Sequence, residues 1–301
     1  MADFNPLFKP ADKPRWQRPS VHALMRAQFN IETFLLVGAV LQSLLTLLLP
    51  LRLAFLPAVL FLLAKIASAY AVNYNLLPNP HMLDQNITTK FSAQLPSPDG
   101  FFGSTPARSP LAVFLIGARN NSPLGIANPQ FKAMGDLMDG MIKQLEANPT
   151  ETGFMGATNW MGTERASNAM NMSVMYFRSA ADVHAFAHGP LHRQAWDWWY
   201  KNLKANEHLS IFHELYEVPS GNYESVYAQM PPTLLAATQH RVVTEEGGRK
   251  KEGWTLPVVD ARKGQLKSSK GRMARSEGRE MDGYGIQDID EDVKVEAREV
   301  V

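Results

Sequence analysis

The chain has 301 residues, a formal net charge of +1 and no cysteine. The balanced charge gives no reason to expect nucleic-acid binding, and the lack of cysteine excludes disulfides, thiolate metal ligands and a cysteine nucleophile. Because composition changes sharply along the chain, the sequence predicts one folded domain with appendages.

Residues 1–30 form a polar flank rich in basic side chains, and residues 31–72 contain two apolar runs separated by Pro50 and Arg52. A membrane span needs about 20 apolar residues. The sequence therefore predicts a transmembrane or re-entrant helical hairpin, with a buried helical pair as the alternative. Because basic flanks stay cytosolic and a hairpin returns the chain to the same side, we expect a membrane-anchored protein. Its main domain would face the cytosol, at the endoplasmic reticulum.

Two further segments look irregular. Residues 73–110 are rich in proline, asparagine and serine, which predicts a linker. Residues 241–301 are polar and strongly charged with few aromatic side chains, which predicts a disordered tail. Such a tail would be solvated, or its basic part would contact anionic lipid.

The segment 111–240 has the patterns of a compact α+β domain. Short apolar or alternating runs indicate strands, apolar residues at helical spacing indicate helices, and an extra helix is expected within 223–238. The predicted order is strand 111–118, helix 129–147, strand 154–161, strand 170–177, a helix after Ser179 and strand 210–218. This is the split βαβ, or ferredoxin-like, plan. One sheet face would remain open, so we expect a homodimer that forms a dimeric α/β barrel.

The densest chemistry lies between Tyr176 and Tyr200, where three histidines and three tryptophans are gathered. His184, His188 and His192 are four residues apart, but Gly189-Pro190 should break the helix between the last two. Imidazole can act as general base, hydrogen-bond donor or iron ligand. His184 is the least suited of the three, and the alternative for each is a polar-face histidine.

Metal and nucleotide sites are not expected. Neither histidine pair carries the glutamate of a zincin helix, although His213 and Glu214 could add ligands. No glycine-rich phosphate loop or nucleophile elbow is present in the sequence.

Four quoted segments resemble a known family: FLIGARNNSPLG, GFMGATNWMG, VMYFRSAADVHAFAHGPLHRQAWDWW and HELYEVPSGNYESVYAQMPP. They are similar to fungal membrane-anchored monooxygenase-like proteins, related to the antibiotic-biosynthesis monooxygenases, that occur in secondary-metabolite pathways such as that of fumagillin. The resemblance implies a dimeric ferredoxin-like barrel and the oxygenation of a lipophilic terpenoid or polyketide intermediate.

The resemblance leaves the cofactor open. Members of the wider fold often oxidise electron-rich substrates without a cofactor, and Asn159, Trp160 and Arg178 are residue types that serve in such relatives. The histidine block also resembles haem-containing aldoxime dehydratases, which would make His188 or His192 a haem ligand.

We therefore expect an enzyme that uses O2 on an apolar small molecule, with no cofactor or with haem. His192, with His188 as alternate, would be the base, and Arg178 and Asn159 would stabilise negative charge. The side chains expected to line the substrate pocket are Trp160, Tyr176, Trp196, Trp199 and His213. A haem-dependent dehydratase and a non-enzymatic lipophile carrier are the alternatives.

Overall fold

The computed structural model describes residues 3–82, 86–163, 170–246 and 248–279. The chain divides into two compact units, one of residues 20–86 and one of residues 1–19 together with 87–301. Each unit is described by itself.

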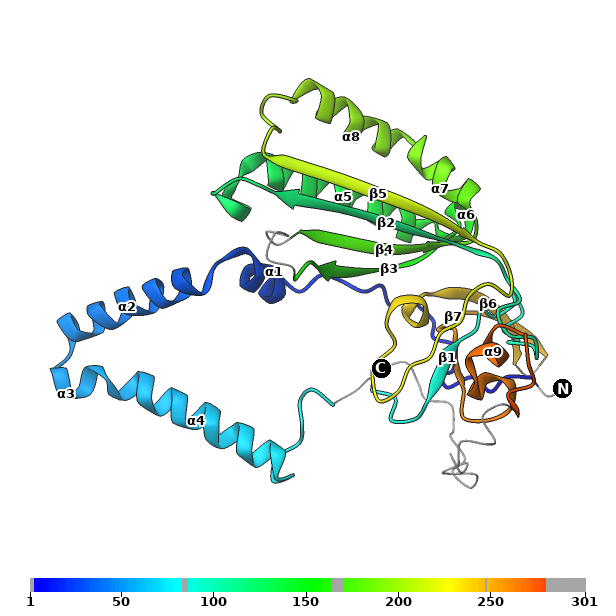
Figure 1. Cartoon of the computed structure of the whole chain (residues 1–301), viewed down its shortest axis with the longest axis horizontal. Coiled ribbons are helices and arrows are strands. Elements are labelled where there is room, and N and C mark those ends of the chain that lie inside the picture. Colours follow the sequence, from blue (N-terminus) through cyan, green and yellow to red (C-terminus); the bar gives the residue numbers. More distant parts are fainter. Residues whose placement is uncertain (1–2, 83–85, 164–169, 247, 280–301) are drawn as a thin grey trace. The chain divides into compact units, whose positions relative to one another are not determined.

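The smaller unit is an apolar helical hairpin (Figure 1). Its helices are α1 (Val21–Gln28), α2 (Ile31–Leu48), α3 (Leu51–Ala54) and α4 (Leu56–Asn73). The segments Ile31–Leu48 and Leu51–Asn73, of 18 and 23 residues, are long and apolar enough to cross a membrane, and neither is buried.

Polar side chains within α2 bond to main-chain carbonyls. Gln42 donates its amide to the Ala54 carbonyl, while Ser43 and Thr46 donate to carbonyls of their own helix. Such bonds satisfy polar groups where no water is present, as a bilayer requires.

The larger unit contains a four-stranded sheet in the order β3-β4-β2-β5, with every neighbouring pair antiparallel. This arrangement confirms the predicted ferredoxin-like plan. The strands are β2 (Leu111–Asn120), β3 (Phe154–Met161), β4 (Asn171–Phe177) and β5 (Leu209–Val218), and the covering helices are α5 (Pro129–Ala147), α7 (Ala180–Ala187) and α8 (Pro190–Lys201). A short α6 (Pro149–Thr152) and a 3-10 turn, η1 (Gly125–Ala127), complete the connections.

Local sequence explains where these helices begin and end. Asn128 caps α5 by accepting from the backbone nitrogens of Gln130 and Phe131, and Ser179 caps α7 by accepting from Asp182. The expected break at Gly189-Pro190 is confirmed, since α7 ends at Ala187 and α8 begins at Pro190.

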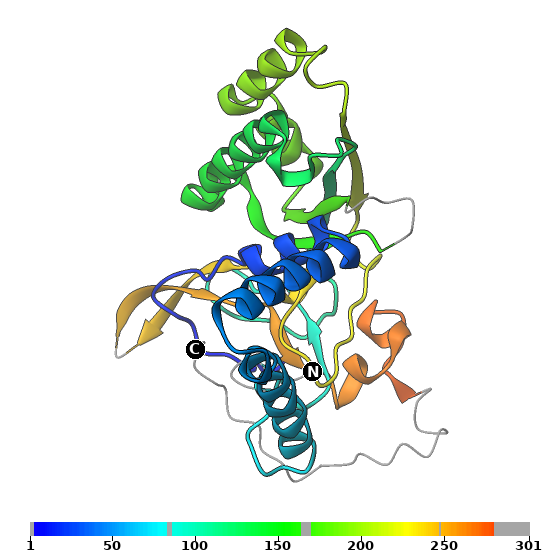
Figure 2. The same cartoon turned by 90° about the vertical axis from the view of Figure 1, so that its left-hand side faces the viewer.

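The helices α5, α7 and α8 lie on one face of the sheet, as the green ribbons show in Figure 2. Phe154, Phe177 and Val183 pack there with Ala112 and Leu145 in one buried cluster.

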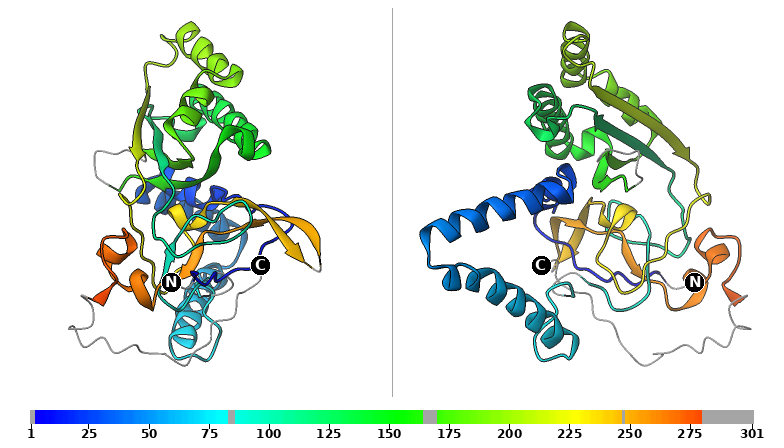
Figure 3. Two further views of the ribbon diagram at one scale, coloured as in Figure 1. Left: turned by 90° about the vertical axis from the view of Figure 1, so that its right-hand side faces the viewer. Right: turned by 60° about the vertical axis from the view of Figure 1, so that its left-hand side comes forward.

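The opposite face of the sheet is covered in part by the chain's own distant segments (Figure 3). Tyr176 and Val174 of β4 pack against Phe91 and Tyr227, whose rings stack at 4.9 Å, and against Leu7 near the N-terminus. We expected a second copy to cover this face, whereas much of the cover is intramolecular.

The predicted linker and the described part of the predicted tail are folded, which corrects both expectations. Strand β1 (Phe91–Ala93) pairs with β8 (Val258–Asp260), and β6 (His240–Glu246) pairs with β7 (Arg249–Thr255). The high charge of 241–279 suggested disorder, yet Val258, Val259 and Leu266 are almost completely buried. Short elements η4 (Gly264–Lys267) and α9 (Ser269–Arg272) follow. Residues 280–301 of the predicted tail lie outside the described residues.

The extra helix expected within 223–238 is also corrected. That segment is mainly extended, with only a 3-10 turn, η3 (Leu234–Ala237), after Pro231 and Pro232. Consecutive prolines remove two helical donors, and the segment instead joins its neighbours through bridges such as Phe91 with Tyr227.

Replacing Phe91 with alanine should lower the free energy of unfolding by about 3–5 kcal/mol, because the ring is completely buried. Denaturant unfolding of the detergent-solubilised chain measures this. Phe101→Ala is the matched control, since that ring is 61% exposed in the same segment, and it should change stability by less than about 0.5 kcal/mol. Equal changes in the free energy of unfolding for the two substitutions would contradict the conclusion that Phe91 lies in a folded segment.

Candidate functional site

The layer between helices and sheet is not packed evenly along β2. On the helix-facing side of β2, Ala112, Phe114 and the last residue, Asn120, are buried, whereas Ile116 and Ala118 between them are half-buried. Helix α8 has no buried residue along its 12 positions. We call the loosely covered part, around Ile116 and Ala118, the open end.

Helix α5 shows the same gradient. Its C-terminal residues Met141 and Leu145 are buried, while Phe131, Met134 and Met138 are half-buried. The spacing of these residues places them on one face of the helix. Apolar surface therefore remains incompletely covered near the start of α5, the side on which β2 ends.

His192 lies in the first turn of α8, and its Nδ1 is buried without a hydrogen-bond partner among the described residues. Its ring centroid lies 5.5 Å from that of Phe186 and 6.0 Å from that of Trp196. Trp196 in turn stacks on Tyr200, with ring centroids 5.4 Å apart. The His192 imidazole is therefore the first of three rings that follow one another along α8.

Burial lowers the pKa of His192 below its usual value of 6.5. The backbone carbonyl of Ala187 partly offsets this shift in pKa, and the nearby imidazoles of His213 and His188 lower it further. The ring is therefore neutral at neutral pH and can accept a proton, as a general base must.

The structure brings only some of the predicted histidines close to His192. His213 on β5 faces the helices, with its ring centroid 5.6 Å from that of Phe114. His188 forms the C-cap of α7 and is exposed. His184 is also exposed and is not among the groups that shift the pKa of His192.

Asn159 lies on the same sheet face, but on the opposite edge strand. Its Oδ1 accepts a 2.7 Å hydrogen bond from the Ser173 hydroxyl on β4. Ser173 was not singled out in the sequence. Its alternation with Met175 and Phe177 was visible, but its role depends on strand pairing, which a single sequence does not show.

Three predicted site residues lie elsewhere, and these are corrections. Arg178 is half-exposed just after β4 and pairs with Asp182 at 3.5 Å, which is the surface ion pair expected of a residue without a catalytic role. Tyr176 and Trp160 project from the face opposite the helices, because strand residues alternate between faces. Burial raises the pKa of Tyr176, which belongs to the core under that face.

Trp199, expected to line the substrate, is half-buried on α8, and its ring centroid lies 6.4 Å from that of Trp198. Its backbone carbonyl accepts from the amide of the buried Asn206. Trp199 therefore lies within α8, the helix that borders the open end.

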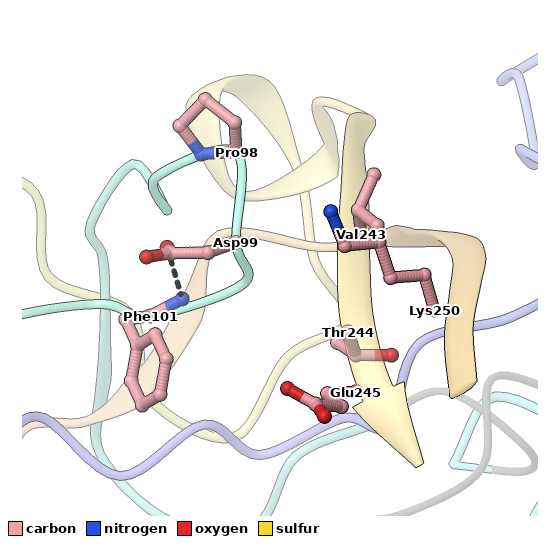
Figure 4. A pocket seen from close by; sticks show the side chains of 7 residues that line it. All are labelled: Pro98, Asp99, Phe101, Val243, Thr244, Glu245 and Lys250. Carbon is pink, nitrogen blue, oxygen red and sulfur yellow. Dashed lines mark hydrogen bonds between the residues drawn. The ribbon is translucent and has the colours of Figure 1, made fainter. Parts of the chain in front are cut away.

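Neither a metal centre nor a separate hollow supplies a better site. Among the residues that the structure describes, no group of three or more metal-ligating side chains is gathered. A hollow of about 460 Å³ lies between the 98–101 loop and the β6–β7 hairpin (Figure 4). It contains no imidazole, and the carboxylate of Asp99 is held there by Ser97 and the Phe101 backbone. We therefore place the chemistry at the open end.

The strand order and helix placement define a ferredoxin-like α+β domain with an imidazole in its helix–sheet layer. The family model for monooxygenase af470-like proteins matches residues 111–235. Monooxygenase af470 of Aspergillus fumigatus is 32% identical over 274 residues, which cover 90% of this chain and 98% of that protein. The chain belongs to the monooxygenase af470-like family.

Similarity to solved structures is distant. An aldoxime dehydratase, OxdRE, in complex with butyraldoxime has 10% identity and a TM-score of 0.36, over 50% of this chain and 43% of that one. A putative monooxygenase from Lactobacillus acidophilus has 6% identity and a TM-score of 0.26, over 47% and 52% of the two chains. This chain thus spans less than half of the dehydratase.

The His192 ring should titrate with a midpoint below 6.5, because its pKa is lowered mainly by burial. An NMR pH titration of histidine-labelled protein measures this, and His192→Gln identifies the signal by removing it. His184→Gln is the control and should leave that signal in place. A midpoint above 6.5 for His192 would show that the imidazole is not desolvated.

Proposed function

We propose that this protein oxidises an apolar metabolite with O2 and that His192 is the base. The observation that carries the proposal is the neutral imidazole of His192, half-buried among aromatic rings with an unpartnered Nδ1 among the described residues. Proton removal by a positioned imidazole contributes about 10²–10⁴-fold to a rate. Family membership supports a monooxygenase-like function.

The chemistry balances without a separate reductant. His192 removes a proton from an activated CH2 group, and the resulting carbanion gives its electrons to O2. One oxygen atom becomes the carbonyl oxygen of the product, and the other leaves as water with the two hydrogens of the CH2 group. A site with few polar groups favours this step, because it limits the solvation of the carbanion and of the reduced oxygen species.

The proposed substrate is a lipophilic terpenoid or polyketide intermediate of secondary metabolism. Half-buried Ile116 and Met134, with the exposed Trp196, offer apolar and aromatic surface at the open end. A flat or extended hydrocarbon would bury this surface, which is favourable by roughly 25 cal/mol per Å².

We further propose that the hairpin anchors the protein in a membrane, with the larger unit in the cytosol at the endoplasmic reticulum. Two unburied apolar segments of spanning length support this. An apolar substrate concentrates in a bilayer, so an anchored enzyme would be close to it. A homodimer is supported by Trp160 and Tyr216, which remain 44% and 51% exposed on the second sheet face.

Substituting His192 with glutamine should reduce turnover by about 10²–10⁴-fold. The substrate is first obtained as the metabolite that accumulates in a strain lacking the gene. Oxygen uptake by purified wild-type and variant proteins then measures turnover. His184→Gln, an exposed histidine one helix earlier, is the matched control and should retain full activity.

The outcomes also decide between the alternatives. Full oxygen uptake by His192→Gln would contradict the role of the base. A Soret band in active wild-type protein that His192→Gln abolishes would replace this mechanism with a haem-dependent one. Binding without turnover of the accumulated metabolite would indicate a carrier.

Deleting residues 31–73 should release the protein from membranes. After carbonate extraction, the wild-type chain is expected in the membrane pellet and the deletion variant in the supernatant, because the two apolar segments are lost. Finding the wild-type chain soluble, or shortened by cleavage after the first apolar segment, would contradict the anchor.

A further inference from the structure

On the helix-facing side of the sheet, residues that pair across neighbouring strands form rows. One of these rows has a polar residue at each edge of the sheet. The row crosses all four strands, with His213 on β5, Ile116 on β2, Ser173 on β4 and Asn159 on β3. The neighbouring row toward the packed end contains Leu215, Phe114, Met175 and Ala157, which are all apolar. The polar row therefore stands at the limit of the packed core, where the open end begins.

The two polar ends of this row are far apart. Adjacent strands are separated by about 4.8 Å, so three spacings place β5 and β3 about 14 Å apart. The His192 ring packs on Phe186 of α7, a helix that contacts β2, β4 and β5, whereas α5 contacts β3, so the proposed base lies toward the β5 side of the sheet. A reacting carbon atom held at this imidazole therefore lies on the other side of the sheet from the Asn159 amide. We therefore no longer expect Asn159 to stabilise charge at the reaction centre.

The hydrogen bond from Ser173 determines which atom of the Asn159 amide is available to a ligand. The Ser173 hydroxyl donates to Oδ1 at 2.7 Å, so Nδ2 is left as the free donor of the amide. Within the part of the chain that the structure describes, no group accepts a hydrogen bond from that nitrogen, and the Asn159 side chain is exposed. Ser173 itself is 9% exposed and is held in the middle of the sheet.

We propose that Asn159, oriented by Ser173, is a second polar subsite that binds an oxygen acceptor at the far end of an elongated apolar substrate. The inference rests on the proposed function and adds a substrate class to it. The substrate would extend across the sheet from the carbon near His192 to a carbonyl, ester or hydroxyl oxygen at Asn159. Asn159 contacts the substrate, and Ser173 is a positioning residue.

The test compares two probes of similar length, methyl decanoate, which has a carbonyl acceptor, and dodecane, which has none. Binding to the full chain in detergent is followed by tryptophan fluorescence. Partition of each probe into micelles is the same for every variant, so ratios of apparent Kd remain meaningful. The wild-type Kd of each probe is the reference, and only ester binding should depend on Asn159, because the amide can donate to the ester carbonyl and to nothing in the alkane.

Asn159→Asp keeps the acceptor for Ser173 but replaces the donor with a carboxylate. It should raise the apparent Kd of the ester by about tenfold, equivalent to about 1.4 kcal/mol, and leave that of dodecane within about twofold. Ser173→Ala should weaken ester binding by about threefold, since the amide is then free to rotate, and Ser173→Thr should restore it. Asn121→Asp, in the loop after β2, is the matched control and should change neither.

Two results would overturn the proposal: no change in the ester Kd of Asn159→Asp, or an equal loss of both probes. The last result would show a structural effect of the substitution. These readouts do not depend on turnover. If His192→Gln kept full oxygen uptake while Asn159→Asp weakened ester binding alone, the subsite would stand and the proposed base would fail.

Discussion

A four-stranded antiparallel sheet has two faces to bury, and the way this chain covers them determines where a ligand can bind. One face is covered in large part by distant segments of the same chain, where the stacked rings of Phe91 and Tyr227 pack near Tyr176. The other face lies under α5, α7 and α8, where Phe177 is completely buried but Ile116, at the edge of the same cluster, is only half-buried. An apolar molecule bound at that open end would bury this half-covered surface.

The chemistry at the open end depends on a break in the helix. Because α7 stops before Gly189-Pro190 and α8 starts anew, His192 enters the layer beside Phe186 and is desolvated. A continuous helix would have placed His192 in one stripe with the exposed His184. The break thus produces a neutral imidazole, and the opposite edge strand supplies an oriented amide at Asn159.

The ferredoxin-like order was predictable because it is encoded locally, by apolar spacing and by caps such as Asn128 and Ser179. The place of His192 in the first turn of a new helix was predictable for the same reason, from the proline that follows Gly189. Periodicity shows which strand residues share a face, but not which face the helices cover. Tyr176 and Trp160 were therefore expected to line the substrate, although they project from the face opposite the helices. The pairing of β1 with β8 joins segments far apart in sequence, and the charge of 241–279 obscured buried positions such as Val258.

The central claim is that an apolar ligand binds between helices and sheet at the open end. Hydrogen exchange of the full chain, with and without methyl decanoate, tests it most directly. Bound probe should slow amide exchange in α8 and β5 and leave the loop at 98–101 and the strand segment 243–245 unchanged. Protection confined to these two segments, which line the hollow beside the β6–β7 hairpin, would place the ligand there and contradict the account.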